Sequence, residues 1–163
     1  MKIIQASESQ LPIVAELAYK IWPSAYAEIL SKEQLSFMLG KFYSLEALTE
    51  QLEKRNHVFL LVEENGKYVG FASYESNIEN HKTKIHKIYV LPETQGKGYG
   101  IQLLNDIENR AKNAKDTVLF LNVNRFNKAQ FFYKKAGFEI AYEEDIKIGN
   151  GYLMEDLVME KSI

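Results

Sequence analysis

Apolar residues recur at two different spacings along the chain, and the change of spacing near residue 56 separates a helical segment from a mixed one. Before residue 56 the spacing is three to four, which is typical of amphipathic helices. A short strand and three helices are predicted there, at residues 2–6, 11–21, 32–39 and 44–55. Trp22-Pro23 is expected to end the first helix and Gly40 the second, because the residue before proline leaves the α region and glycine suits the position after a helix.

After residue 56 short apolar and β-branched runs predict strands, and two helical stretches interrupt them. The predicted strands are 57–62, 67–74, 83–91, 117–123, 138–142 and 152–160, and the predicted helices are 100–112 and 129–136. Asn65-Gly66 indicates a type I′ hairpin turn. The nearly continuous apolar run at 117–123 suggests a strand buried on both faces. This order favours a mixed α/β fold with a largely antiparallel front half over a doubly wound dinucleotide-binding fold.

Composition narrows the class of protein without naming an activity. The chain has 163 residues, of which 46% are apolar and 26% charged, so we expect one globular domain spanning 1–163. It contains no cysteine, which excludes disulfides, thiolate metal sites and cysteine nucleophiles, and no metal site is predicted. No apolar run approaches 18 residues and the N-terminus lacks a signal-peptide pattern, so a cytoplasmic location is expected.

The net charge of -2 hides an uneven distribution along the chain. Residues 82–135 carry eleven lysines and arginines against four acidic residues, a balance of +7. The remainder carries nine basic and 18 acidic residues, a balance of −9. This pattern could be a chance placement of solvated surface charge, or it could indicate a polyanion bound by the first segment and a cation bound by the rest. The balanced total argues against a general nucleic-acid binder, and the lack of a long apolar run argues against a membrane partner.

The most specific local feature is Gln95-Gly-Lys-Gly-Tyr-Gly100, between a predicted strand and a predicted helix. Glycines at alternate positions let the backbone approach a ligand closely and expose N–H groups. The helix that follows directs its positive end to the same point. We therefore expect a pyrophosphate site. It is neither a P-loop, which needs a Lys-Ser/Thr pair, nor a dinucleotide fingerprint, whose glycine spacing differs.

Two segments resemble the GNAT N-acetyltransferase superfamily. Ile85-His-Lys-Ile-Tyr-Val-Leu-Pro-Glu-Thr-Gln-Gly-Lys-Gly-Tyr-Gly100 resembles its motif A, and Leu121-Asn-Val-Asn-Arg-Phe-Asn127 with Phe132-Tyr-Lys-Lys-Ala-Gly-Phe138 resembles its motif B. The resemblance covers residues 57–142 well. It implies a GNAT-like α/β (α+β) fold, with a mixed, mostly antiparallel sheet flanked by helices and its fourth and fifth strands splayed to receive CoA.

The resemblance also implies acetyl-CoA as the acetyl donor and assigns residues to it. The backbone of Ile88, Tyr89 and Val90 would pair with the pantetheine arm, and the Val90 N–H would polarise the thioester carbonyl. The pyrophosphate would be held by Gln95, Gly96, Lys97, Gly98, Tyr99, Gly100 and Ile101. Asn127 would bind the CoA arm, but it precedes the motif B tyrosine by six residues where the family usually has seven. Asn122 and Asn124 are therefore kept as alternatives.

The catalytic residues are expected from the same resemblance. Tyr133 would be the general acid that protonates the departing thiolate, which a neutral phenol can do near pH 7. His86 occupies the place where relatives often have a glutamate base, and an imidazole with an ordinary pKa near 6.5 can accept a proton there. Glu75, at the end of the neighbouring strand on the acceptor side, is the second candidate base.

The acceptor is less constrained. Trp22, Tyr26 and Tyr43 could line an acceptor slot by cation–π contact, or could form only a hydrophobic lid. The balance of −9 and a loose resemblance in layout to bacterial polyamine (spermidine/spermine) acetyltransferases favour a small cationic amine. Without cysteine, direct transfer in a ternary complex is expected.

Two alternatives stay open. One is an enzyme of the same fold that acts on a protein N-terminus, a lysine, an antibiotic or an amino acid. The other is a non-catalytic acyl-CoA-binding regulatory module. A homodimer formed through the last two strands also remains an alternative.

Overall fold

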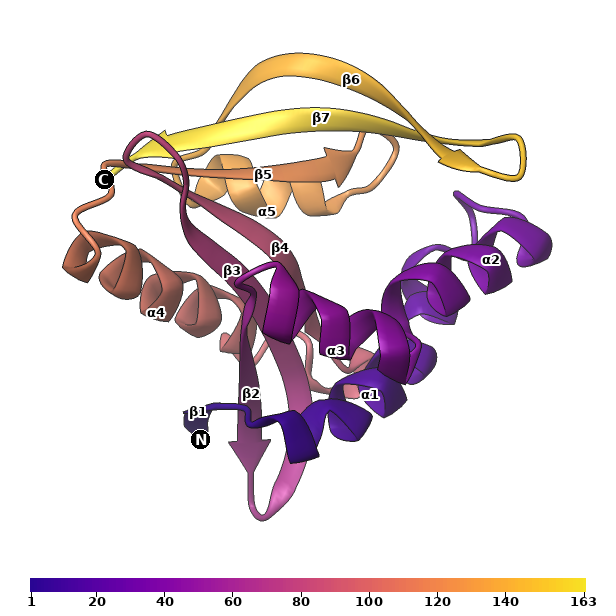
Figure 1. The fold of residues 1–163 in the computed structure, drawn as a ribbon, viewed down its shortest axis with the longest axis horizontal. Coiled ribbons are helices and arrows are strands. Elements are labelled where there is room, and N and C mark those ends of the chain that lie inside the picture. The colour runs from indigo at the N-terminus through magenta and orange to yellow at the C-terminus, as the bar shows by residue number, and fades with distance from the viewer.

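The computed structural model describes residues 1–163, and a single seven-stranded sheet runs through it (Figure 1). The strands are β1 (Lys2–Gln5), β2 (Val58–Glu64), β3 (Lys67–Glu79), β4 (Lys82–Val90), β5 (Val118–Asn124), β6 (Glu139–Gly149) and β7 (Tyr152–Ser162). Their spatial order is β1-β2-β3-β4-β5-β7-β6. Every neighbouring pair is antiparallel except β4 and β5, which are parallel. The predicted mixed, mostly antiparallel sheet is confirmed.

Helices cover both faces of the sheet. One face carries α1 (Leu11–Ala25), α2 (Lys32–Tyr43) and α3 (Leu45–Lys54), and the other carries α4 (Tyr99–Asn113) and α5 (Ala129–Lys135). Short 3₁₀ turns, η1 (Glu8–Gln10) and η2 (Pro92–Thr94), precede α1 and α4. Alternate residues of β2 serve the two cores, since Phe59 and Leu61 pack under α1–α3 whereas Leu60 and Val62 pack under α4. The sheet centre is therefore buried on both sides.

Serine residues are the N-caps of η1, α2 and α3. The backbone N–H of Ser7 donates to Gln10 Oε1 at 2.9 Å, which completes a capping box. Ser31 Oγ accepts from the N–H of Gln34, and Ser44 Oγ accepts from the N–H of Ala47, each at 3.1 Å. These caps satisfy N–H groups that have no partner inside the helix.

Two predicted helix ends are wrong. α1 continues through Pro23 to Ala25, because Pro23 stands in the last turn and the burial of Trp22 there outweighs one lost backbone bond. α2 continues through Gly40 to Tyr43, a buried residue whose packing holds the final turn. In both cases tertiary packing overrides a local end signal.

The turn between β2 and β3 agrees with the prediction. Asn65 and Gly66 both have positive φ, 51° and 78°, which confirms the predicted hairpin turn.

The remaining strands differ from the prediction in extent and burial. β5 is buried on alternate residues rather than on both faces, because no helix covers its second face along its whole length. β6 and β7 extend beyond the predicted ends through mutual pairing. β7 lies between β5 and β6, so only β6 of these two is an edge strand.

A β-bulge at His86 bends β4. Tyr74 pairs with Ile85 and the preceding Ser73 pairs with Lys87, so His86 is the extra residue. Since one inserted residue reverses the alternation of side chains, residues after His86 point to the opposite face from the one that period two predicts. The side chain of Ile85 accordingly packs with the α4 core, whereas Lys87 contacts the ring of Tyr43 in the α1–α3 core.

β4 and β5 separate directly after this bulge. Their pairing covers only Lys82–Ile85 with Val118–Leu121. Beyond these residues the two strands have no ladder bonds to each other, which confirms the predicted splay.

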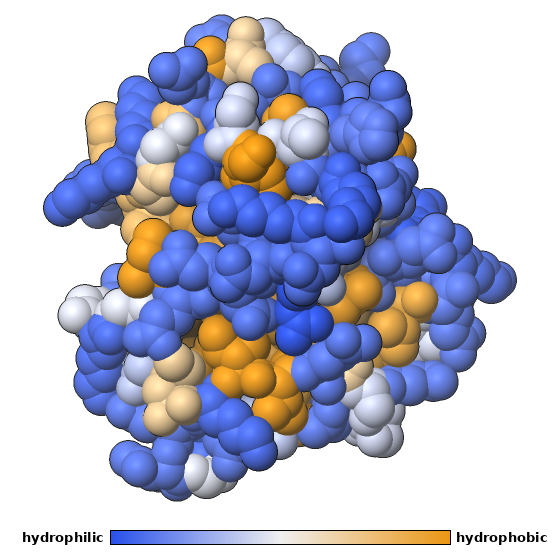
Figure 2. Space-filling model, turned by 90° about the vertical axis from the view of Figure 1, so that its left-hand side faces the viewer, coloured by the Kyte–Doolittle hydropathy of each residue, from blue (hydrophilic) through white to orange (hydrophobic).

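Charged and polar side chains dominate the surface shown in Figure 2, with hydrophobic side chains gathered in small patches between them. None of the helices has both the length and the apolar composition that a membrane crossing requires.

Candidate active site

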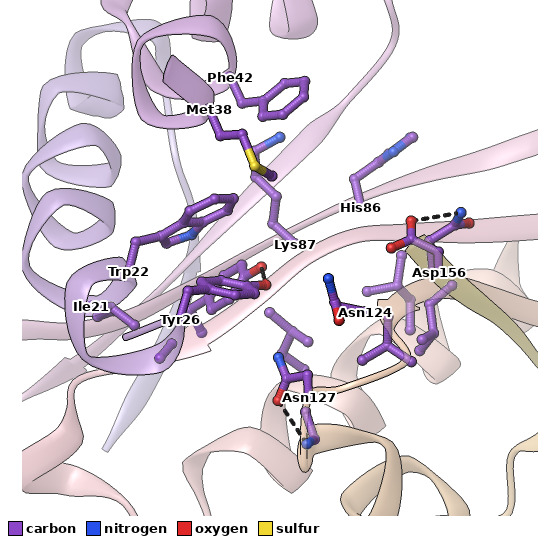
Figure 3. Close-up of a pocket in the computed structure, with 18 of the residues that line it drawn as sticks. Ile21, Trp22, Tyr26, Met38, Phe42, His86, Lys87, Asn124, Asn127 and Asp156 are labelled. Carbon is purple, nitrogen blue, oxygen red and sulfur yellow. Dashed lines mark hydrogen bonds between the residues drawn. The ribbon is translucent and has the colours of Figure 1, made fainter. Parts of the chain in front are cut away.

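A cavity of about 1190 Å³ occupies the fork between β4 and β5. Its walls come from the splayed strands, the beginnings of α4 and α5, helices α1 and α2, and the β6–β7 hairpin. The close-up in Figure 3 shows side chains from these elements converging on one space. The fork thus brings together residues as far apart along the chain as Ile21 and Asp156.

The glycine turn forms one end of the cavity. Gly96 and Gly98 have φ of 86° and 83°, in the left-handed region that favours glycine, and Gly98 is the N-cap of α4. The first N–H groups of α4 have no partners within the helix and are available to an anion. A Cβ at Gly100 would meet the ring of Phe132 at 3.4 Å, so close packing of α4 on α5 also requires glycine there.

Most of the predicted pyrophosphate residues line the cavity, with differences in detail. The lining includes Gln95, Gly96, Gly98, Tyr99, Gly100 and Ile101. The side chain of Lys97 does not line it, and its Nζ lies 3.4 Å from Glu64 Oε1. The side chain of Tyr99 is buried in the α4 core. The backbone N–H of Lys97 donates to the carbonyl of Thr94 at 3.4 Å, so of these two positions only the N–H of Tyr99 is placed to contact a ligand.

The edge of β4 supplies backbone groups along the fork. The N–H of Leu91 donates to the carbonyl of Val69 at 2.8 Å, toward β3. Because successive N–H groups of a strand point to opposite sides, those of Ile88 and Val90 point toward the gap. The side chain of Tyr89 faces the α1–α3 core, where its hydroxyl lies 2.9 Å from that of Tyr26.

Tyr133 lies on α5 and lines the fork. It is 7% exposed, and its ring packs edge-on against Phe132 and Phe138 at centroid distances of 5.2 and 5.7 Å. Burial raises the pKa of the Tyr133 phenol well above its usual value, so the hydroxyl stays protonated near neutral pH. The geometry therefore presents a neutral phenol to the cavity.

The asparagines near the fork have different partners. Asn127 Oδ1 accepts from the N–H of Ala129 at 2.9 Å, which begins α5, and its amide extends into the cavity in Figure 3. Asn122 Nδ2 lies 3.2 Å from both Glu144 Oε2 and Asp156 Oδ2. The amide of Asn122 is thus engaged by carboxylates of β6 and β7, whereas Asn127 remains accessible from the fork.

The two candidate bases are in direct contact with each other. His86 Nε2 lies 3.1 Å from Glu75 Oε1, and the ring of His86 stacks on that of His57 at 3.8 Å. Burial and neighbouring positive charges lower the pKa of both imidazoles, that of His57 to about 3, so both are neutral at pH 7. Burial raises the pKa of Glu75. Only His86 of this pair lines the cavity, so Glu75 can influence a ligand in the cavity only through its contact with the His86 imidazole.

His57, Glu75 and His86 each place one ligand-type atom within 4.8 Å of the others. The two imidazole rings lie nearly parallel, with an interplanar angle of 11°. Their nitrogen lone pairs lie in those ring planes and do not meet at one point. In this arrangement the three residues are a hydrogen-bonded stack rather than a coordination site.

The predicted acceptor aromatics form a buried cluster on the cavity wall. The ring of Trp22 lies 4.6 Å from that of Tyr26, 5.3 Å from that of Tyr43 and 5.9 Å from that of Tyr89. All four residues line the cavity, and three of them are also members of the α1–α3 core. The cluster therefore serves packing and also presents an apolar wall.

Sequence reasoning missed two buried charged residues in the cavity. Lys87 is 8% exposed, and its Nζ donates to Gln51 Oε1 at 2.8 Å and lies 5.2 Å from the ring centre of Tyr43. Burial, aided by Lys84, lowers the pKa of Lys87 to about 7. The strand period places Lys87 on the wrong face unless the bulge at His86 is known.

Asp156, on β7, is the second missed residue. It is 2% exposed, and burial raises its pKa above the usual range. It faces the cavity across from His86 in Figure 3. Its only sequence signal was the acidic pair Glu155-Asp156 within an otherwise largely apolar strand, which by itself indicates no site.

The β6–β7 hairpin closes the far end of the cavity against α2. Lys41 Nζ donates to the carbonyl of Ile148 at 2.6 Å, and Gln34 Nε2 donates to that of Leu153 at 3.0 Å. The rings of Phe37 and Tyr152 pack at 5.3 Å. Access to the far end is consequently narrowed by a hairpin from the opposite end of the chain.

Comparisons with known proteins identify the family. An acetyltransferase (GNAT) domain model matches residues 26–161. An uncharacterized N-acetyltransferase, MJ1207 of Methanocaldococcus jannaschii, is 39% identical over 87 residues, which is 50% of this chain and only 38% of that protein. The crystal structure of PaiA N-acetyltransferase from Thermoplasma acidophilum in complex with coenzyme A superposes with a TM-score of 0.82 at 28% identity, covering 99% of this chain and 98% of that one.

A ribosomal-protein-alanine N-acetyltransferase from Brucella melitensis has a TM-score of 0.73 at 25% identity, with full coverage of both chains. The family match spans most of the chain and includes the fork, the glycine turn and Tyr133. The chain therefore belongs to the GNAT family of acetyl-CoA-dependent N-acetyltransferases.

Proposed function

We propose that the protein transfers the acetyl group of acetyl-CoA directly to a primary amine while both substrates are bound. The observation that carries this proposal is the single cavity joining the glycine turn, the free N–H groups of β4, Tyr133 and His86. A donor entering from the glycine turn and an amine entering beside His86 would meet in the fork. Acetyl-CoA supplies an activated thioester, and the residues of the chain orient it and move protons.

The donor end would be held mainly by backbone groups. N–H groups of the glycine turn and the start of α4 would bind the pyrophosphate, as helix N-termini do for anions. The free edge of Ile88, Tyr89 and Val90 would pair with the pantetheine amides. The N–H of Val90 is placed to stabilise negative charge that develops on the carbonyl oxygen. The accessible amide of Asn127 would contact the same arm.

Two side chains would move protons. The amine nitrogen forms a bond to the acyl carbon as the carbon–sulfur bond breaks, and Tyr133 donates its phenol proton to the departing thiolate. The nitrogen loses a proton to His86, directly or through water. Glu75 would hold the imidazole in position through the 3.1 Å contact. Near pH 7 burial keeps the phenol protonated and the imidazole neutral, and the lowered pKa of His86 makes it a weaker proton acceptor than a free imidazole.

The charge of the cavity does not match the predicted acceptor, a polyamine. The polyamine hypothesis used the balance of −9 outside the motifs, but these acids do not gather in the cavity. Asp156 is the single acidic residue among the lining residues. A small amine remains favoured over a folded protein, because the hairpin narrows the far end. The exposed N-terminus of a protein is the second candidate, since a ribosomal-protein-alanine acetyltransferase is among the similar structures.

Changing Tyr133 to Phe tests the proposal. We expect kcat for thiol release to fall about 100-fold, the size typical of a lost general acid, while the Kd for acetyl-CoA stays unchanged. Tyr142→Phe is the matched control, because Tyr142 is exposed on β6. A Tyr133→Phe enzyme with unchanged kcat would contradict the assignment. Tight CoA binding by the wild type without turnover across a broad amine panel would instead support the non-catalytic module.

A further inference from the structure

Basic residues outnumber acidic residues in the lining of the cavity. Six basic residues line it, namely Lys41, Arg55, Lys84, Lys87, Lys128 and Lys147. Their excess over the single acid of the lining is the reverse of what a polycationic acceptor requires.

Three of these cations surround the stacked imidazoles. Lys84 and Lys87 flank His86 on β4, Arg55 lies two residues before His57, and all five residues line the cavity. Lys87 has only the neutral amide of Gln51 as a hydrogen-bonding partner. A buried ammonium without a carboxylate is costly, which is why burial lowers the pKa of Lys87 to about 7, and an anion bound beside it would favour the charged form.

Few carboxylates lie near these cations, and Glu75 is the direct cross-strand partner of Lys84. Glu50 lies 3.6 Å from the Nε of Arg55 in an exposed pair. Glu75 contacts His86, and Asp156 accepts from Asn122. None of them forms an ion pair with Lys84 or Lys87. A second unmet group lies at the same place, since the buried Nδ1 of His57 has no hydrogen-bonding partner.

This cluster is separate from the pyrophosphate site. Lys87 contacts Tyr43 on the α1–α3 face of the sheet, and Arg55 directly follows α3. The glycine turn leads into α4, whose Tyr99 packs in the core of the opposite face. The phosphates of a bound donor would therefore not neutralise Arg55, Lys84 and Lys87.

Apolar side chains stand beside the cluster. Figure 3 shows Trp22, Met38 and Phe42 on the side of the α helices, with Lys87 between them and Asp156. All of these residues line the cavity. A ligand that matches this end needs an apolar body and a negatively charged group.

We propose that the acceptor is a primary amine that carries an anionic oxygen group and an apolar body, as an apolar α-amino acid does. The anionic group, a carboxylate or a phosphate, binds among Arg55, Lys84 and Lys87, and the apolar body lies against Trp22, Met38 and Phe42. The amine then faces the fork beside His86. This inference rests on the proposed acetyl transfer and replaces the polyamine with a different class of amine.

The proposed anionic acceptor can be tested with matched pairs of amines, each assayed with acetyl-CoA by detection of the released thiol. We expect phenylalanine and methionine to exceed their amides in kcat/KM by at least about tenfold, since an amide lacks the charge that the cluster binds. Phosphoethanolamine against ethanolamine tests a phosphate instead of a carboxylate. Spermidine and an alanine-initiated peptide complete the panel. Equal or better use of spermidine, of the amides and of ethanolamine would overturn the inference while leaving acetyl transfer in place.

Charge-removing variants locate the preference. Arg55→Gln and Lys84→Gln should each lower the acid-over-amide ratio about tenfold, through KM rather than kcat. Lys54→Gln is the matched control, because it removes the same charge one residue away and Lys54 does not line the cavity. A ratio that falls equally in Lys54→Gln, or not at all in the other two, contradicts the inference. Absence of turnover with every acceptor, while CoA still binds, contradicts the proposed function itself.

Discussion

The two ends of the cavity are lined by different kinds of group, backbone N–H groups at one end and side chains at the other. At the donor end, the groups that face the fork are mostly backbone N–H groups of one continuous stretch, residues 88–101. At the proposed acceptor end, they are side chains from α1, α2, β4, β7 and the turn between α3 and β2, including Trp22, His57, Lys87 and Asp156. Backbone groups depend on the conformation of the chain, whereas side chains also depend on residue type. Acetyl-donor recognition should therefore be sensitive to glycine replacement, and acceptor choice to changes of charge.

The largest expected effect comes from the donor end. Gly98→Val places a β-branched residue at φ 83° and disturbs N–H groups at the start of α4. We expect the Kd for CoA, measured by calorimetry, to rise about 100-fold, since each hydrogen bond to a charged group contributes about 1.5–3 kcal/mol.

Gly66→Val is the control for backbone strain. Gly66 also has positive φ but lies in the β2–β3 hairpin turn. Both variants should lose about 1–2 kcal/mol of stability, and only Gly98→Val should lose CoA affinity. Equal CoA binding by the two variants would show that the glycine turn does not hold the donor.

An intermediate effect comes from the imidazole stack at the acceptor end. Above pH 6.5 the imidazoles are neutral in both folded and unfolded states and contribute no pH dependence. Below pH 6.5 the unfolded chain takes up protons that the folded protein excludes until its own pKa, about 3 for His57, is reached. The free energy of unfolding should therefore decrease as the pH is lowered below 6.5, by about 1.4 kcal/mol per pH unit for each fully buried imidazole.

His57→Gln should remove part of that slope. Between pH 7 and pH 5, urea unfolding should show the variant losing about 1–2 kcal/mol less than the wild type. His81→Gln is the control, since His81 is exposed. Parallel losses in the wild type and His57→Gln would mean that His57 is not held neutral, and the contrast between the two ends would weaken.

The smallest expected effect concerns the hairpin that closes the acceptor end. Lys41→Met removes the hydrogen bond to Ile148 and should raise the KM for the acceptor about threefold, with faster amide exchange in the hairpin. The KM for acetyl-CoA should not change. Lys32→Met, at the exposed start of the same helix, is the control. A change in acetyl-CoA KM alone would place the hairpin at the donor end instead.

The fold was largely predictable because its signals are local. Capping serines, the Asn65-Gly66 turn and apolar periodicity placed the elements in the correct order. Errors occurred where packing overrides a local signal, as at Pro23 and Gly40, and where pairing extends a polar strand, as in β6. The glycine turn was equally predictable, since its residues follow one another in a single motif, and most of them line the cavity.

The acceptor residues were less predictable for a physical reason. A strand's period assigns each side chain to a face only while the register is unbroken. The bulge at His86 breaks it and turns Lys87 into the cavity, and no local pattern announces that bulge. Asp156 reaches the same cavity only because β7 inserts between β5 and β6.

The sequence alone determined the family, the order of elements, the glycine turn and the position of the tyrosine of α5, because each depends on residues that are close together along the chain. The tertiary structure decided which charges meet. Summed along the chain, the acids outside the motifs indicated a cationic acceptor. Once folded, most of those acids lie outside the cavity, and Arg55, Lys84 and Lys87 line it. Charge acts through distance in space, so its distribution along the chain could not predict the field inside the site.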